Sequence, residues 1–373
     1  MKLFSLFTAL VGSSDREIRL ADIVRSVVEP PTDPIAHISL TRSNQRLDHR
    51  PYVKVGFLME GPDMKGYSAL FQTSSSVSYA KAWTSPKLGL PVYSSEPGEI
   101  AARPARNGEG YLNEDYDILG PSRFLQIGEK IIAESNRTVS EYACIFNGNE
   151  SFAFPISLDL IVEFSGSTDK TRVADFLIGA SPTSDFANFV KVFVLADASR
   201  ELFIGEETVE MVETLCYGGK TFSYFPTFSD PDAWIIEGSI GGIDCAFELS
   251  TGAYSPNHLL EVDPQIIDQV TQILLANNAR QSLVNGMFSF CTNEAVAALP
   301  TIDLQFGRED DNPVILSFSP NEYVIHQKFT QRCMLLLSPQ IGTMILGPKI
   351  LNKIVTVFDA YRKRVGICLA NIE

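Results

Sequence analysis

The sequence has few histidines and cysteines, and neither type occurs in a pattern that holds metal ions. No Cys-x-x-Cys pair and no His-Glu-x-x-His motif is found among the 373 residues, which argues against a zinc site. We therefore predict no metal and no other cofactor. The histidines are scattered singly, at His37, His49, His258 and His326.

Positive charge is also scarce. The chain has 30 Lys and Arg against 45 Asp and Glu, a formal net charge of −15 at pH 7, and no basic cluster along its length. Nucleic acids are bound mainly through clustered Lys and Arg, so we exclude them as partners. The acidic balance predicts a soluble protein that anionic surfaces repel.

Long apolar runs are missing too, and no stretch reaches the ~20 residues of a membrane-spanning helix. The N-terminus does carry a shorter one: a Lys precedes an apolar run from Leu3 to Val11, and small residues follow at 12–14. This order predicts a secretory signal at residues 1–14, with a buried first strand as the alternative. A secreted or secretory-pathway protein without a membrane span is the expectation.

Two further features fit an exported chain. Asn136 and Asn149 each begin an Asn-x-Ser/Thr tripeptide, which makes both candidate glycosylation sites. The number of cysteines is even, which favours disulfides in an oxidising compartment. The six are Cys144, Cys216, Cys245, Cys291, Cys333 and Cys368.

What the sequence has in quantity is strand-forming residues. It contains 24 Phe and 12 Tyr, and short runs of Val, Ile and Thr alternate with turn residues. Helical spacing is clearest within residues 259–285, where apolar residues recur at three-to-four spacing: Ile266, Ile267, Val270, Ile273, Leu274 and Leu275. Residues 15–50, broken by prolines, are interpreted as a propeptide or an N-terminal arm. A mostly-β protein with a few helices is predicted.

Two distant segments repeat one plan. Residues 68–75 (SALFQTSS) and 246–253 (AFELSTGA) are both apolar strands that run into a small, hydroxyl-rich turn. Each is followed downstream by a strand ending in glycine, FLIG at 176–179 and MILG at 344–347. Two halves with one plan predict two similar lobes, which we place at residues 51–189 and 190–373.

The second half resembles the pepsin-like aspartic proteases. Residues 345–359 (ILGPKILNKIVTVFD) and 364–370 (RVGICLA) are similar to the C-terminal signature of that family, although Pro348 stands where an Asp is usual. Residues 233–242 (AWIIEGSIGG) and 291–302 (CTNEAVAALPTI) resemble two further family segments. The resemblance implies a mostly-β, bilobal pepsin-like fold with a central interlobe cleft. It also implies a disulfide between Cys291 and Cys333 and leaves the other four cysteines unassigned.

The resemblance locates the catalytic positions as well. The family uses two Asp-Thr-Gly loops whose carboxylates share one proton and activate a water molecule. Here the corresponding loops read FQTSS at 71–75 and LSTGA at 249–253, so Gln72 and Ser250 occupy the two aspartate positions. No Asp-Thr-Gly or Asp-Ser-Gly occurs anywhere in the chain.

Other residues of the two loops match the family. Thr73 and Thr251 stand at its threonine positions, whose hydroxyls bond from one loop to the other. Gly252 is kept, whereas Ser74 replaces the first glycine and puts the backbone conformation there in question. The expected scaffold therefore remains although both carboxylates are replaced.

The flap departs from the family pattern, because Ile127, followed by Gly128, stands where a tyrosine is usual. A remaining carboxylate in the second loop region is Glu248, which lies two residues before Ser250 and hence on the same strand face. Glu248 is the alternative source of a catalytic carboxylate, although a single displaced carboxylate does not make a proton-sharing pair.

A carboxamide is not a general base, and a serine hydroxyl needs a neighbouring base to become a nucleophile. We therefore predict a catalytically inactive, monomeric glycoprotein that binds a protein or extended peptide, in the manner of an inhibitor or ligand. One alternative is an altered aspartic endopeptidase. The other is a structural surface glycoprotein with a vestigial cleft, which bulky side chains such as Ile127 or Phe71 would block.

Overall fold

The computed structural model describes residues 36–42, 50–57, 67–84, 91–93, 117–120, 123–127, 131–147, 150–165, 176–206, 208–228, 232–252, 259–282, 286–308 and 312–371. The predicted signal peptide lies outside these residues, as does most of the 15–50 segment. Strands dominate, and the predicted mostly-β fold class is confirmed. The chain divides into two compact units that alternate along the sequence: unit 1 includes Val53–Ala69 and Val77–Leu177, and unit 2 comprises Leu40–Tyr52, Leu70–Ser76 and Ile178–Glu373.

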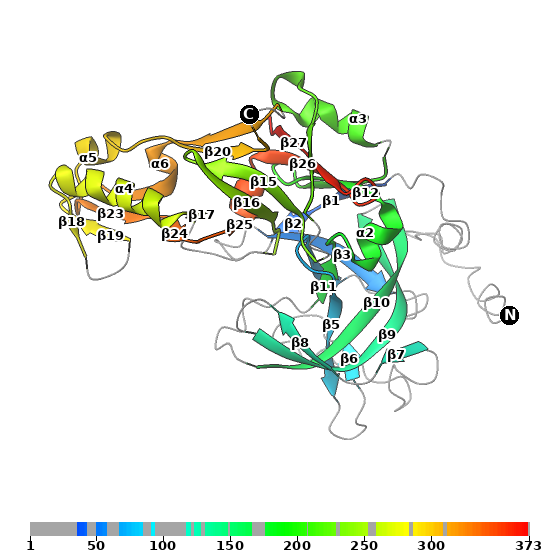
Figure 1. Cartoon of the computed structure of the whole chain (residues 1–373). Helices are drawn as coiled ribbons and strands as arrows, with labels where there is room; N and C mark the ends of the chain where they lie inside the picture. Colours follow the sequence, from blue (N-terminus) through cyan, green and yellow to red (C-terminus); the bar gives the residue numbers. More distant parts are fainter. Residues whose placement is uncertain are drawn as a thin grey trace. The chain divides into compact units, whose positions relative to one another are not determined.

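Unit 1 is built on a long antiparallel hairpin of β9 (Ile131–Asn147) and β10 (Glu150–Ser165), seen in Figure 1. Strand β5 (Ser78–Thr84) pairs in parallel with β10. Its other strands are β1 (Ala36–Ser39), β3 (Pro51–Phe57), β4 (Tyr67–Gln72), β6 (Pro91–Tyr93), β7 (Asp117–Gly120), β8 (Arg123–Ile127) and β11 (Phe176–Gly179), of which β3, β4 and β11 continue into unit 2. Buried Ile145, Phe154 and Leu158 form part of its core.

The described part of the predicted propeptide or N-terminal arm forms two strands, β1 and β2 (Thr41–Arg42). Its side chains alternate: Ala36, Ile38 and Leu40 are buried, whereas His37 and Ser39 are exposed. This two-residue period is that of a strand with one face against a core.

The main sheet of unit 2 has the strand order β13 (Glu201–Ile204), β12 (Val192–Ala196), β26 (Ile354–Asp359), β27 (Arg364–Leu369) and β14 (Ser223–Pro226). Every residue of β12 and β26 is buried. Continuous burial, rather than alternation, shows that both faces of these strands are covered. A disulfide between Cys216 and Cys368, which sequence reasoning left unassigned, lies within the apolar cluster on this sheet.

A second sheet has the order β21 (Val314–Phe318), β20 (Ile302–Phe306), β15 (Ile235–Ile240), β16 (Ile243–Leu249) and β25 (Thr343–Leu346). Strands β15 and β16 are joined by a two-residue turn, Gly241-Gly242, with φ of 56° and 81°. Positive φ at both positions is what a tight hairpin turn of this twist requires, and glycine adopts it without strain. The helices of unit 2 are α2 (Asp185–Val190), α3 (Thr208–Val212), α4 (Pro264–Ala276), α5 (Asn293–Ala297), α6 (Pro320–Tyr323) and α7 (Pro348–Leu351), with 3-10 turns η5 (Glu213–Leu215) and η6 (Tyr217–Gly219).

A third region of unit 2 holds the four-stranded sheet β18 (Arg280–Gln281), β19 (Met287–Ser289), β23 (Arg332–Leu335) and β22 (Val324–Gln327), and the parallel pair β17 (Leu260–Val262) and β24 (Leu337–Pro339). The helix expected within 259–285 is shorter than predicted. It begins at Pro264, because the Asp263 carboxylate accepts from the Gln265 N–H at 2.9 Å. It ends at Ala276, before Asn278 with φ of 66°.

The predicted disulfide Cys291–Cys333 is present.

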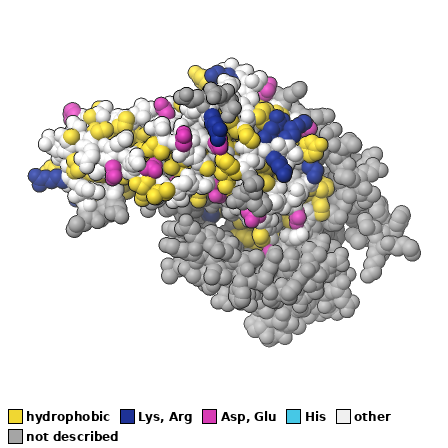
Figure 2. Space-filling model, viewed as in Figure 1, with side chains coloured by type: hydrophobic (Ala, Val, Ile, Leu, Met, Phe, Trp, Pro, Cys, Tyr) yellow, Lys and Arg dark blue, Asp and Glu magenta, His cyan; other side chains and the backbone are white. Residues whose placement is uncertain are grey.

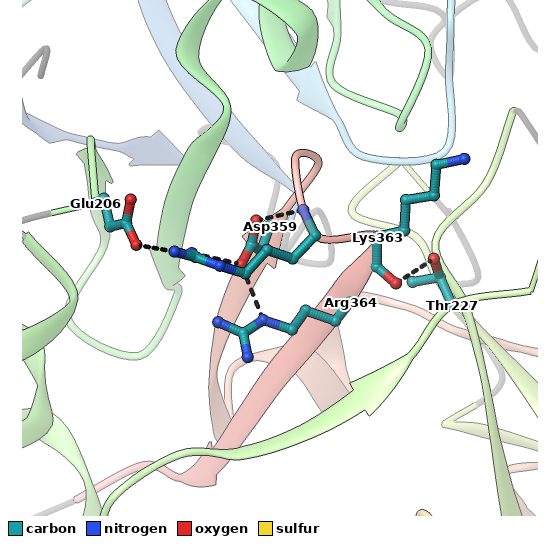
Figure 3. A network of polar contacts seen from close by, with 6 residues as sticks. Glu206, Thr227, Asp359, Lys363 and Arg364 are labelled. Atoms are coloured by element: carbon teal, nitrogen blue, oxygen red, sulfur yellow. Dashed lines mark hydrogen bonds and ion pairs between the residues drawn. The ribbon is translucent and has the colours of Figure 1, made fainter. Parts of the chain in front are cut away.

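The turn between β26 and β27 is held by a buried carboxylate. Asp359 accepts from the backbone N–H of Arg362 at 2.9 Å and from Nε of Arg364 at 2.9 Å, and Arg362 also pairs with Glu206 (Figure 3). The Arg364 guanidinium lies 4.0 Å from the centre of the Tyr224 ring. These contacts give the family-like VFD segment a structural role, since a buried charge is tolerated only when it is paired and hydrogen-bonded.

Among the described helices, none combines the length and apolar character needed to cross a membrane.

Candidate functional site

The two loops singled out in the sequence lie within one unit and are built alike. Gln72 is the last residue of β4, and Ser250 follows the last residue of β16. Each is bonded at the downstream segment of its own repeat: the Ala180 N–H, just after β11, donates to the Gln72 carbonyl at 2.8 Å, and the Ser250 N–H donates to the Leu346 carbonyl of β25 at 3.0 Å. The internal duplication seen in the sequence is therefore present in the hydrogen bonding.

The two threonines join the loops through reciprocal hydrogen bonds. The Thr73 N–H donates to Oγ1 of Thr251 at 2.9 Å, and the Thr251 N–H donates to Oγ1 of Thr73 at 3.1 Å. Each hydroxyl then donates to a carbonyl of the opposite strand, Thr73 to Leu249 at 2.7 Å and Thr251 to Phe71 at 2.6 Å. Both side chains are buried, so each hydroxyl satisfies one donor and one acceptor that water does not reach.

At the two positions predicted to correspond to the family's carboxylates, the structure has a chain of neutral groups. Nε2 of Gln72 donates to Oγ of Ser74 at 3.2 Å, and the Oγ atoms of Ser74 and Ser250 are 2.6 Å apart. A hydroxyl that accepts from the amide still has its own proton to donate, so the two bonds can run in one direction, from Gln72 through Ser74 to Ser250. Ser74 therefore has a role in the site, whereas sequence reasoning noted it only as a replaced glycine. The run of three serines at 74–76 was the available signal.

The Gln72 side chain also restricts which residue type can occupy position 252. A Cβ built on Gly252 would come within 2.6 Å of Cγ and of Oε1 of Gln72, well inside van der Waals contact. Only glycine leaves room for Gln72 in this position. The retained glycine of the second loop thus accommodates the replaced residue of the first.

The residue before Gln72 points into the core. Phe71 is fully buried, and its ring packs edge-on against Phe186 at 5.2 Å and Phe193 at 5.8 Å between centroids. Phe193 stacks on Phe358 at 4.8 Å, and Trp234 bonds the Ala180 carbonyl through Nε1 at 2.8 Å. Phe71 therefore belongs to the core beneath the loops, so of the two examples named for a blocked cleft it is not a blocking side chain.

The described residues of the two loops, 70–76 and 249–252, include no ionisable side chain. Glu248, the alternative carboxylate, is half-buried in β16, where it pairs with Ile235 and Ile345. Farther along, α7 carries Lys349, whose pKa burial lowers from its ordinary value. Two hydroxyls and a carboxamide can exchange hydrogen bonds with a ligand, but they cannot take up and return a proton near neutral pH.

Several predicted site residues are only partly described. The backbone of Ile127 ends β8 and pairs with Ile131 of β9, so a hairpin is present where the flap was expected. Asn136 lies within β9. Gly128 and Asn149 lie outside the described residues, and the roles predicted for all four positions stay predictions.

Two cysteines are free, Cys144 and Cys245. Burial raises the pKa of each thiol to about 12, so neither is a reactive thiolate at physiological pH. Among the described residues no group of three or more His, Cys, Asp or Glu is placed to hold a metal ion.

A mostly-β chain in which two threonine-centred loops meet through their hydroxyls has the architecture of the pepsin-like class. Residues 253–370 match the model of the eukaryotic aspartyl protease family, which confirms the resemblance predicted for this part of the chain. A comparison with curated proteins found no match. The matched residues begin just after the second loop, so the assignment of Gln72 and Ser250 to the catalytic positions stays a prediction.

Proposed function

We propose that this protein is a secreted, non-proteolytic relative of the aspartic proteases that binds an extended peptide segment of a partner protein. The observation that carries the proposal is the neutral chain from Gln72 through Ser74 to Ser250. Proteolysis by this family needs two carboxylates that share a proton at that place. Without them the attacking water has no general base.

The intact threonine framework supports a retained binding role. Each hydroxyl of Thr73 and Thr251 makes two hydrogen bonds between the loops, and a rigid aromatic cluster underlies them. Gln72 and Ser74 are half-buried, which leaves polar groups available to the backbone of a bound strand. Peptides that bind in extended form rely on such backbone hydrogen bonds. Secretion is supported by the signal-like N-terminus and by two disulfides.

Binding is tested by selecting peptides from a displayed library of random sequences on the immobilised full chain. The selected peptides are then measured by calorimetry against Gln72→Arg, whose bulky cation occupies the polar loop. The matched control is Gln272→Arg on the exposed side of α4.

We expect at least a ten-fold loss of affinity with Gln72→Arg, since a single charged-group mismatch in a polar site costs about 1.4 kcal/mol or more. Affinity for Gln272→Arg should equal that of the wild type. Equal binding to both variants would show that the peptides bind elsewhere and would refute the proposed site.

A further inference from the structure

The four-stranded sheet β18–β19–β23–β22 has one face that points away from its core. Side chains paired side by side across strands lie on the same face. Phe288 and Cys333 pair with each other and are buried, and a row on either side of them faces the opposite way. We call these two rows the outer face. One row has exposed Arg280, Arg332 and Gln327 with half-buried Ser289, and the other has exposed Ile325 with half-buried Met287 and Met334.

Two aromatic rings stand at one end of the outer face. Phe329, in the 328–331 turn between β22 and β23, has a relative exposure of 106%, and Phe290 has 55%. The Cys291 N–H donates to the Gln331 carbonyl at 2.8 Å, which brings the Phe290 segment beside this turn. Phe290 has a φ of 56°, a conformation that bulky residues rarely adopt, and the Arg280 guanidinium lies 5.0 Å from its ring centre. The exposed Phe290 side chain is therefore held by a backbone conformation that costs conformational free energy.

The charge of this end is opposite to that of the whole chain. The four strands and the 328–331 turn include Arg280, Lys328 and Arg332 but no Asp or Glu. None of these three cations forms an ion pair within the described part of the chain. Figure 2 shows a dark-blue patch at the left edge of the view, where Figure 1 places β18 and β23. A chain of net charge −15 thus presents a local surplus of positive charge beside exposed rings.

A second exposed turn shows that this combination is local. Tyr361, between β26 and β27, is 74% exposed and is also flanked by arginines. There, however, Arg362 pairs with Glu206 and Asp359, and Arg364 pairs with Asp359. Both arginines of that turn are therefore paired within the protein and only Lys363 is left without an ion pair among the described residues, whereas Arg280, Lys328 and Arg332 form none there.

We propose that the outer face docks on the surface of an anionic lipid membrane. Phe329 and Phe290 enter the interfacial layer, where aromatic rings are favoured, and Arg280, Lys328 and Arg332 bind headgroup phosphates. The acidic remainder of the chain is repelled by the same surface, so the charge distribution sets a single orientation. This inference is independent of the Gln72 and Ser250 site.

The geometry favours a membrane over an acidic protein partner. A fully exposed ring on a tight turn requires a matching pocket in a protein, whereas a fluid bilayer accommodates it at any point. The apolar row of Met287, Met334 and Ile325 is a single strip, which is small for a stable protein interface. Lipid binding needs only a few inserted apolar groups together with nearby cations.

The experiment is co-sedimentation of the full chain with vesicles of phosphatidylcholine alone, and with vesicles in which roughly a third of the lipid is phosphatidylserine. Three variants are compared: Phe329→Ser, the pair Lys328→Gln with Arg332→Gln, and Tyr361→Ser as the matched exposed aromatic. All four positions are exposed, so folding is expected to be unaffected and is checked by the denaturation midpoint. Phe329→Trp supplies a second readout through its fluorescence.

We expect wild-type binding to the phosphatidylserine vesicles only, and its loss at high salt. The charge pair should weaken it about twenty-five-fold, since each cation near the surface contributes about five-fold. Phe329→Ser should weaken it about five-fold, as a partly buried ring predicts, and Tyr361→Ser should have no effect. A blue shift of Phe329→Trp with these vesicles is also expected.

Absence of wild-type binding would overturn the proposal. Loss with the charge pair but none with Phe329→Ser, and no blue shift, would overturn it in favour of a purely electrostatic surface for an acidic protein. An equal loss with Tyr361→Ser would show that the outer face is not the docking surface.

Discussion

At the scale of single residues, the two loops combine a neutral pair of side chains with an intact threonine framework. Gln72 and Ser250 carry no charge at the positions predicted for the catalytic carboxylates, while Thr73 and Thr251 keep the loops joined. The substitutions also fit one another. Gly252 leaves room for the Gln72 side chain, and Ser74 supplies a hydroxyl between the two replaced positions. Such mutual fit is expected of a site that has settled into a new, neutral arrangement.

The threonine pair predicts a large effect from a small change. Thr251→Val keeps the shape of the side chain but leaves the Thr73 N–H and the Phe71 carbonyl buried without their partner. Unfolding by denaturant should show a loss of about 2–4 kcal/mol in the free energy of unfolding, because two buried polar groups are left unsatisfied. Thr330→Val, at an exposed turn, is the control and should change stability by less than about 0.5 kcal/mol. A near-neutral Thr251→Val would mean that the two loops are not held together in this way.

At the scale of elements, the short helix α6 is joined to the C-terminal part of unit 2 by one carboxylate. Glu322 accepts from the N–H and Oγ of Ser319 at 2.8 and 2.9 Å and from Nζ of Lys353 at 2.6 Å. Burial acts to raise the pKa of Glu322, but the hydrogen bonds from Lys353 and Ser319 outweigh it and hold this pKa below its ordinary value of 4.5. The ionised form is therefore the one that stabilises the fold.

This shift predicts a pH-dependent cost for Glu322→Gln. Since the pKa is lower in the folded than in the unfolded chain, the contribution is complete above about pH 4.5 and is lost as the pH falls through the folded value. At pH 7 we expect the variant to lose about 1 kcal/mol, a modest amount because the pair is partly exposed. The difference from wild type should vanish in denaturation curves recorded at acid pH. A difference that stays unchanged as the pH is lowered to the point where the folded protein's carboxylates are protonated would contradict the assigned role of the carboxylate.

Much of the element order could be predicted from sequence, because apolar strands, turn residues and the C-terminal signature are local patterns. The limits are also physical. The helix predicted within 259–285 is longer than the observed one. Apolar periodicity alone does not show the N-terminal cap at Asp263 or the left-handed backbone of Asn278 beyond the C-terminal end. The Cys216–Cys368 disulfide joins residues 152 apart, and no spacing rule connects them. The basic outer face could not be predicted from composition, because strand pairing is what brings Arg280 beside Lys328 and Arg332.

At the scale of the whole molecule, the two unusual regions of unit 2 are distinct. The loop pair around Gln72 and Ser250 is neutral and polar, whereas the outer face around Phe329 and Arg332 is cationic and aromatic. One suits the backbone of a peptide, and the other suits a charged, fluid surface. A protein with both could hold a peptide partner at a membrane, and each activity is tested separately by the variants described above.

The central claim is that the chain does not cleave peptides. Its most direct test is the rate of hydrolysis of denatured casein by the purified, folded protein, measured between pH about 3 and 7, where a carboxylate dyad would act. The account predicts no cleavage above the buffer blank at any pH, and the same result for Ser250→Ala. Steady cleavage by the wild type that Ser250→Ala or Gln72→Ala abolishes would contradict it.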